Sequence, residues 1–265
     1  MDIPARSEVD DLIDPQPLPP FARIRYEPET ERIEDPVTAV TDELPSLDFE
    51  TLPEGATVAV GIGSRGIHAL SDIAHAVVQF LDERGFDPVI VPAMGSHGGA
   101  TPEGQREVLA SLDVTEDRVG TSIDARMTTE ELETVTVGET DYPVHIATSA
   151  LEADGVLVVN RVKPHTNYQG PVESGLTKMT VVGLGKQRGA KAFHSTAIKE
   201  GYYETLTAAL DVIESAVPLI GGIALLENFD EKTSHVEAIP AGSFLDREPP
   251  LLEQAYEEMA TLPIQ

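Results

Sequence analysis

Stretches of consecutive apolar residues alternate along the chain with stretches in which apolar residues recur every three or four positions. The consecutive kind predicts buried strands at TVAVGIG from Thr57, at DPVIVPA, at residues 155–162 and at IGGIALLEN. The periodic kind predicts amphipathic helices at residues 36–44, 69–84, 102–112, 173–182, 203–217 and 244–260. Strands that alternate with helices favour an α/β class, a layered Rossmann-like fold with a mostly parallel sheet flanked by helices.

Three further segments complete the predicted organisation. Residues 1–21 are rich in Pro and Asp without periodicity and predict an irregular lead-in, followed by a short strand at residues 22–26 that opens an α/β domain over residues 22–265. A hairpin is predicted at residues 134–147, with its turn at residues 138–141. The sequence GLGKQRG, residues 183–189, predicts a glycine-rich turn.

Acidic residues dominate the charge of the chain. Asp and Glu number 46 against 18 Lys and Arg, which gives a formal net charge of −28. This charge argues against a nucleic acid or an anionic membrane as a partner, because their phosphate groups would be repelled. Dense acidity with little Lys also suits molar salt, which screens the self-repulsion of the fold. We therefore expect a halophilic protein of a salt-rich cytoplasm.

The chain lacks Cys and long apolar segments. Without Cys there is no disulfide, thiolate nucleophile or zinc–thiolate site, so a metal would have to be bound by His, carboxylate or a cofactor. The longest apolar run, residues 216–226, is far shorter than the roughly 20 residues of a membrane-spanning helix. No basic segment followed by an apolar one opens the sequence, as it would in a secretory leader. These features predict a soluble, cytoplasmic protein.

Three loops with polar side chains follow three of the predicted strands. They are Gly-Ser-Arg-Gly at residues 63–66, Gly-Ser-His-Gly-Gly at residues 95–99 and Lys-Pro-His-Thr at residues 163–166. Because the carboxyl ends of parallel strands meet at one edge of a sheet, where open α/β folds bind their ligands, we expect Arg65, His97 and His165 to converge. His97 and His165 are the candidates for acid/base chemistry, since neither has bulky apolar neighbours to bury it.

The first of these loops also matches a dinucleotide-binding pattern. Gly61, Gly63 and Gly66 fit G-x-G-x-x-G between a strand and a helix. However, the second strand ends in VIVPAMG, without the acidic residue that binds the ribose hydroxyls. An NAD(P)-dependent oxidoreductase is therefore a minor alternative.

Positive charge gathers in one segment of this acidic chain. Between residues 155 and 199 a single acid, Glu173, stands among seven basic residues: Arg161, Lys163, Lys178, Lys186, Arg188, Lys191 and Lys199. The cluster indicates an anionic ligand, phosphate or carboxylate, near His165. His194 lies in the same segment and is a candidate ligand of a metal or substrate. Two histidines at an anion-binding cleft favour acid/base work on a small carboxylate.

The chain resembles the N-terminal domain of the nickel-dependent lactate racemase family, in its haloarchaeal-type Gly-Ser-Arg-Gly branch. Four stretches carry the resemblance: GIGSRGI, VPAMGSHGGATPEGQ, VNRVKPHTNYQGPVESGLTKM and GLGKQRGAKAFH. The resemblance implies a nickel pincer nucleotide, a nicotinate-derived mononucleotide held covalently by a lysine. It also implies a second domain, which residues 22–265 do not contain. Either the sequence is a piece of a longer protein, or a further polypeptide is the partner that supplies this domain.

The resemblance also implies a role for each matching residue. Lys178 would attach the nucleotide and lie at the nickel, and His194 would be the nickel ligand. His97 and His165 would be the paired catalytic acid/bases. The remaining cofactor- and substrate-binding residues would be Arg65, Arg161 and Lys163.

Together these observations predict an isomerase, a racemase or epimerase of a small 2-hydroxy acid. The C2 hydrogen of such an acid is too weakly acidic for a bare imidazole, so the resemblance implies that the cofactor accepts it as hydride while a histidine takes the hydroxyl proton. One alternative is a non-catalytic domain that binds the nucleotide or another anionic ligand. The other is the NAD(P)-dependent oxidoreductase.

Overall fold

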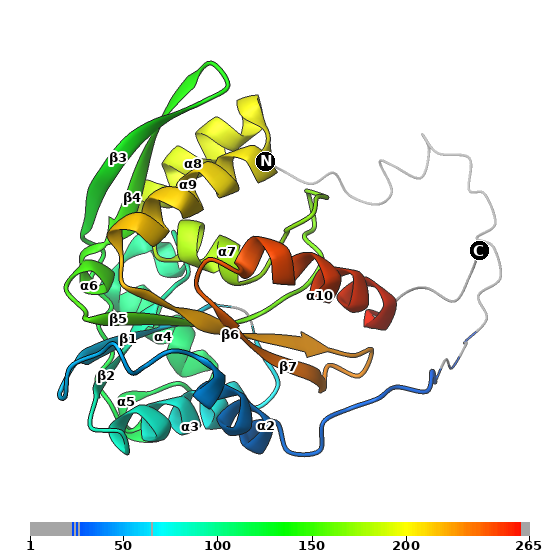
Figure 1. The fold of residues 1–265 in the computed structure, drawn as a ribbon. Helices are drawn as coiled ribbons and strands as arrows, with labels where there is room; N and C mark the ends of the chain where they lie inside the picture. Colours follow the sequence, from blue (N-terminus) through cyan, green and yellow to red (C-terminus); the bar gives the residue numbers. More distant parts are fainter. Residues whose placement is uncertain (1–22, 24, 26, 65, 261–265) are drawn as a thin grey trace, which may run out of the picture. The chain divides into compact units, whose positions relative to one another are not determined.

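A sheet of five strands forms the centre of the structure (Figure 1). The computed structural model describes residues 23, 25, 27–64 and 66–260, and Thr30–Thr261 form one compact unit. The strands lie in the order β2 (Asp87–Pro92), β1 (Thr57–Ile62), β5 (Gly155–Arg161), β6 (Leu219–Glu227) and β7 (Thr233–Pro240). The first four are parallel, and β7 pairs with β6 in the antiparallel sense. The predicted α/β fold with a mostly parallel sheet is confirmed.

Helices and a hairpin cover the two faces of the sheet. One face packs against β3 (Thr129–Val137), β4 (Thr140–Ala147), α8 (Lys186–Glu200), α9 (Tyr202–Ala216) and α10 (Phe244–Glu258). The other face packs against α2 (Pro36–Glu43), α3 (Leu70–Asp82), α4 (Pro102–Ser111) and α5 (Glu116–Val119). The short elements are α6 (Thr148–Leu151), α7 (Leu176–Lys178), the π-helical turn η3 (Met179–Gly183) and the 3-10 turns η1 (Leu44–Ser46) and η2 (Gly98–Ala100).

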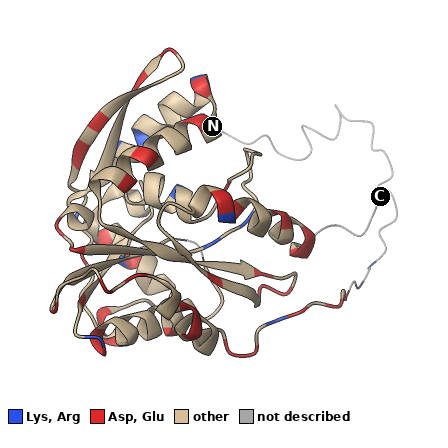
Figure 2. Cartoon of the chain, viewed as in Figure 1, with Lys and Arg blue, Asp and Glu red and all other residues tan. Residues whose placement is uncertain are grey.

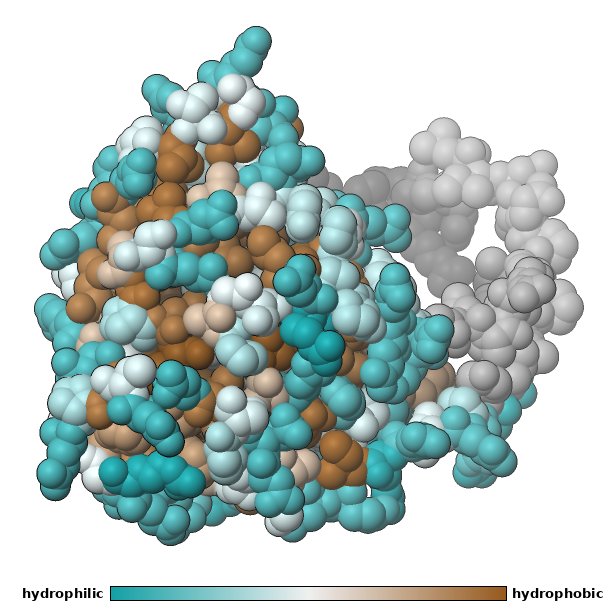
Figure 3. Space-filling model, viewed as in Figure 1, coloured by the Kyte–Doolittle hydropathy of each residue, from teal (hydrophilic) through white to brown (hydrophobic). Residues whose placement is uncertain are grey.

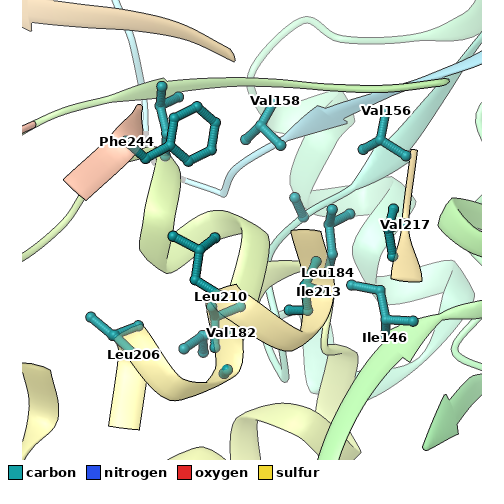
Figure 4. Packing of buried hydrophobic residues seen from close by; sticks show 14 of the residues in the cluster. Ile146, Val156, Val158, Val182, Leu184, Leu206, Leu210, Ile213, Val217 and Phe244 are labelled. Atoms are coloured by element: carbon teal, nitrogen blue, oxygen red, sulfur yellow. The ribbon is translucent and has the colours of Figure 1, made fainter. Parts of the chain in front are cut away.

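The central strands are apolar throughout because both of their faces are covered. In β5, Val156 and Val158 belong to one core, whereas Leu157 and Val159 belong to the other. Successive strand residues point to opposite faces, so a strand between two layers needs an apolar residue at nearly every position. The periodic residues of α9 and the residue after its end pack into the core of Val156 and Val158 (Figure 4), namely Leu206, Leu210 and Ile213 with Val217.

The turn predicted at residues 183–189 is shorter in the structure. Leu184 and Gly185 form a turn, but Gly183 belongs to η3 and α8 begins at Lys186, so most of the segment is helical. A Cβ atom on Gly185 would lie 3.2 Å from the carbonyl oxygen of His145 in β4, and one on Gly189 would lie 3.1 Å from the same oxygen. The two glycines therefore allow α8 to approach β4 closely. In the sequence, glycines that are needed for close packing cannot be told apart from glycines that form a turn.

Smaller differences concern the ends of the chain and its edge strand. The hairpin is confirmed, but β3 starts earlier than predicted, at Thr129. Strand β7 has no counterpart in the prediction. The predicted lead-in at residues 1–21 and the strand at residues 22–26 lie outside the described residues, apart from Arg23 and Arg25, which are not in a strand.

The surface reflects the composition. Figure 2 shows Asp and Glu on helices, strands and loops throughout the view, with few Lys and Arg among them. In Figure 3, apolar residues gather over the region of β3, β4, α8 and α9, interrupted by hydrophilic side chains. In the described part of the chain, no helix is long and apolar enough to cross a membrane.

Candidate active site

One cavity of about 210 Å³ lies at the carboxyl edge of β1, β2 and β5. Residues from all three loops line it, including Ser64, His97 and His165. Lys178 at the end of α7 and His194 on α8 line it as well. The structure thus brings together side chains that are far apart in the sequence, because parallel strands end at the same edge.

The remaining predicted residues differ in position. Arg161 and Lys163 line the same cavity, but Arg161 forms an ion pair with the nearly buried carboxylate of Glu227. This partner offsets its charge, which reduces the attraction that Arg161 exerts on an anion. Arg65 lies outside the described residues. Polar residues of the lining that the sequence did not single out are Ser64, Ser96, Asn160, Thr166 and Ser174.

A buried lysine, Lys186, holds the loop that carries His97 in place through hydrogen bonds. Lys186 is fully buried, and its Nζ donates to the carbonyl oxygen of Pro92 at 2.7 Å and to Oε1 of Gln105 at 3.1 Å. Gln105 Nε2 in turn donates to the carbonyl oxygen of Gly95 at 3.0 Å. Burial lowers the pKa of Lys186 to about 8. The inclusion of Lys186 in the predicted anion-binding cluster is therefore wrong, because its ammonium group is hydrogen-bonded within this buried network.

Replacing Gln105 with Ala is expected to lower the free energy of unfolding by about 2 kcal/mol, because it leaves a buried ammonium group and the Gly95 carbonyl short of partners. The measurement is urea unfolding in molar KCl. Gln79→Ala, on the exposed side of α3, is the matched control and should have a much smaller effect. Equal effects of the two substitutions would refute the supporting role of the network.

His97 is oriented by the first loop. The hydroxyl of Ser64 and Nδ1 of His97 are hydrogen-bonded across the two loops. A hydroxyl group can donate or accept, so this contact is compatible with either neutral tautomer of the imidazole. A carboxylate in the same place could only accept. The contact therefore suits a histidine that has to take up a proton in one direction of a reaction and return it in the other.

His165 is held by the one acid of the basic segment. The buried carboxylate of Glu173 accepts hydrogen bonds from the backbone N–H of His165, from that of Gly170 at 3.3 Å, and from the hydroxyl of Tyr256 at 2.9 Å. The backbone N–H of Asn167 donates to Nδ1 of His165 at 3.3 Å, which places the proton of the neutral ring on Nε2. Glu173 thus fixes the backbone of the loop, and Asn167 fixes the ring.

Lys178 affects the charge state of both neighbouring histidines. Burial, followed by the positive charge of Lys178, lowers the pKa of His165 and that of His194. Both rings are therefore neutral at neutral pH, the form in which an imidazole accepts a proton or binds a metal. Among the described residues, no group of three or more His, Asp or Glu is placed to hold a metal ion.

The glycine loop after β1 differs from a dinucleotide-binding loop. A Cβ atom on Gly63 would lie 2.9 Å from Oδ1 of Asn160, so this glycine allows β5 to approach. The next helix, α3, begins only at Leu70, after the left-handed residue Ala69. The helix N-terminus that binds a pyrophosphate group therefore does not follow the last glycine directly.

Comparison with known proteins identifies a similar fold. No protein-family model and no curated protein matches the chain. Among solved structures, the chain is similar to the lactate racemase apoprotein from Thermoanaerobacterium thermosaccharolyticum, with a TM-score of 0.56 and 18% sequence identity. The match covers 87% of this chain and 57% of the racemase, so the chain spans little more than half the length of that protein. At this identity the similarity concerns the fold.

Proposed function

We propose that the chain is a racemase or epimerase of a small 2-hydroxy acid that works with a nickel pincer nucleotide. The observation that carries the proposal is the gathering of His97, His165, Lys178 and His194 around one cavity. The similarity of the fold to that of a lactate racemase apoprotein supports it. A small carboxylate also suits a cavity that Lys163 lines in an otherwise acidic protein.

The residues of the cavity fit such a cofactor. A covalent link requires a lysine beside the metal ligand, and Lys178 lies close enough to His194 to lower its pKa. His194 is a single imidazole without carboxylate or histidine partners for a complete metal site in the described residues, which suits a metal whose other donors belong to the nucleotide. When bound, the nucleotide supplies a reversible hydride acceptor for C2 of the substrate.

The chain's own residues would supply the proton transfers. His97 and His165 come from loops at different strands, so a substrate between them has one imidazole on each side. One histidine would take the proton of the 2-hydroxyl group, and the other would serve the opposite enantiomer. His165 would act as the base only after Nδ1 gives up its hydrogen bond from Asn167, because Nε2 carries the proton while that bond is made. Lys163 would bind the substrate carboxylate or the cofactor phosphate, with Arg65 and the partly neutralised Arg161 as further contributors.

Intact-mass spectrometry and nickel analysis test this proposal. The chain would be expressed in a host that makes the cofactor and purified in molar KCl. A racemase known to carry the cofactor would be prepared in the same way as a positive control. We expect a covalent adduct of nucleotide mass that maps to Lys178, equimolar nickel, and interconversion of the enantiomers of a 2-hydroxy acid. Lys178→Arg should lose the adduct, whereas Lys191→Arg, exposed on α8, should keep it.

Three outcomes would change the conclusion. An unmodified chain beside a modified racemase would refute the cofactor assignment. An adduct without turnover would favour the binding-domain function, with catalysis dependent on a further polypeptide. Binding of NAD(P)H in molar salt by the unmodified chain would favour the oxidoreductase.

A further inference from the structure

An aromatic cluster centred on Tyr202 lies beside the candidate site. The ring of Tyr202 stacks on that of Tyr168, with ring centres 4.4 Å apart, and meets the edge of Phe193 at 4.8 Å. It also contacts both histidines of this side of the cavity, with ring centres 5.8 Å from His165 and 6.2 Å from His194. One side chain therefore touches a candidate acid/base and the candidate metal ligand, which come from different elements.

The hydroxyl group of Tyr202 makes a directional contact with one of these histidines. Its oxygen lies 3.4 Å from Nδ1 of His194. The hydroxyl oxygen of a tyrosine can accept a hydrogen bond from an imidazole N–H. In the tautomer in which Nδ1–H donates to this oxygen, Nε2 carries the lone pair and is the ring nitrogen left for a metal. Metal-bound histidines are usually oriented in this way, by a hydrogen bond at the second nitrogen.

The position of Tyr202 is fixed by the backbone. It is the first residue of α9, and only Gly201 separates it from the end of α8. Gly201 has a φ of 103°, a conformation that side chains disfavour, and a Cβ atom there would meet the carboxylate of Glu204. This tight turn reverses the chain, so Tyr202 returns to His194, eight residues earlier on α8. The contact is thus built into the junction of two long helices.

From this geometry we infer that Tyr202 is a positioning residue, which holds His194 by Nδ1 so that Nε2 faces the cavity as the nickel-ligating atom. The inference rests on the proposed function for the identity of the metal. The ring of Tyr202 stacks on Tyr168 and contacts His165, so the orientation of the metal ligand is connected to that of the neighbouring acid/base. We expect the attachment of the nucleotide to Lys178 to be independent of this hydroxyl group, because the hydroxyl contacts His194.

Tyr202→Phe tests the inference, because it keeps the ring and removes only the hydroxyl group. Tyr203→Phe is the matched control, since Tyr203 makes none of these ring contacts within the described residues. We expect Tyr202→Phe to carry the same amount of adduct on Lys178 as the wild type but to retain nickel about tenfold less tightly against EDTA. Nickel retention equal to that of the wild type and of Tyr203→Phe would overturn the inference.

A second measurement separates this inference from the proposed function. In the nucleotide-free protein, nitrogen-15 NMR of the histidine rings should show one dominant tautomer of His194 in the wild type. In Tyr202→Phe, the two ring nitrogens should move toward the averaged shifts of exchanging tautomers, while Tyr203→Phe stays unchanged. If the wild type itself takes up no nickel, the proposed function fails. In that case the NMR result alone decides whether Tyr202 orients His194.

Discussion

Replacing His97 with Ala is expected to lower the rate of 2-hydroxy acid racemisation by roughly 10²- to 10⁴-fold, the usual contribution of a positioned general acid or base. His165→Ala should give a loss of the same order. The physical reason is that, in the proposed mechanism, each histidine serves one enantiomer, and racemisation needs both proton transfers. The measurement is the interconversion of enantiomers, followed by chiral chromatography, at equal adduct content on Lys178.

A matched control distinguishes lost chemistry from lost structure. His235→Ala removes a histidine of β7, outside the cavity, and should leave turnover within a small factor of the wild type. Ser64→Ala removes the hydrogen-bond partner of His97 Nδ1 and should cause an intermediate loss. Wild-type turnover in either His97→Ala or His165→Ala, with the adduct in place, would remove that histidine from the mechanism.

The placement of the site follows from a simple feature of the sequence. The three parallel strands β1, β2 and β5 are largely apolar runs, which are recognisable without a structure, and a loop with polar side chains follows each of them within a few residues. Their loops had to meet because parallel strands share an edge. The shared edge predicts His97 and His165 as site residues. The basic segment indicates His194 as a candidate ligand, whereas the specific roles of Lys178 and His194 rest on the resemblance to a known family.

The parts that the sequence did not predict depend on distant partners. Strand β7 alternates apolar and polar residues at the sheet's edge, so it lacks the continuous apolar run of the central strands. The buried state of Lys186 depends on Gln105 and on Pro92 at the end of β2, which lie 81 and 94 residues earlier. The neutralisation of Arg161 depends on Glu227 at the end of β6. Counting charges along a segment cannot separate such residues from those that face a ligand.

The same limit applies to Glu248, a single acid among many in the sequence that the structure places next to the site. It is 1% exposed on α10, and its Oε1 accepts the backbone N–H of Thr177 at 2.9 Å, at the start of α7, which carries Lys178. Its Oε2 has no hydrogen-bond partner in the described part of the chain. Burial raises the pKa of Glu248 to about 7, from an ordinary value of 4.5.

This raised pKa predicts a pH-dependent stability. Between pH 4.5 and about 7 the folded state binds the proton of Glu248 and the unfolded state releases it, so the free energy of unfolding falls as the pH rises. Glu248→Gln keeps a hydrogen-bond acceptor for the backbone N–H of Thr177 and cannot ionise, so its free energy of unfolding does not show this fall with pH. Relative to the wild type, the variant should gain about 3 kcal/mol between about pH 4 and about pH 8, the free energy of a shift of that size.

Urea unfolding at several pH values in molar KCl measures this gain. High salt keeps the many surface carboxylates screened, so the difference between variant and wild type reports the buried group. Glu253→Gln removes an exposed carboxylate of the same helix and should differ from the wild type by an amount that does not change with pH. If Glu248→Gln behaves like Glu253→Gln at every pH, Glu248 ionises in the folded protein without lowering the free energy of unfolding. The anchoring of α7 to α10 would then rest on a charge–amide hydrogen bond and not on a neutral acid.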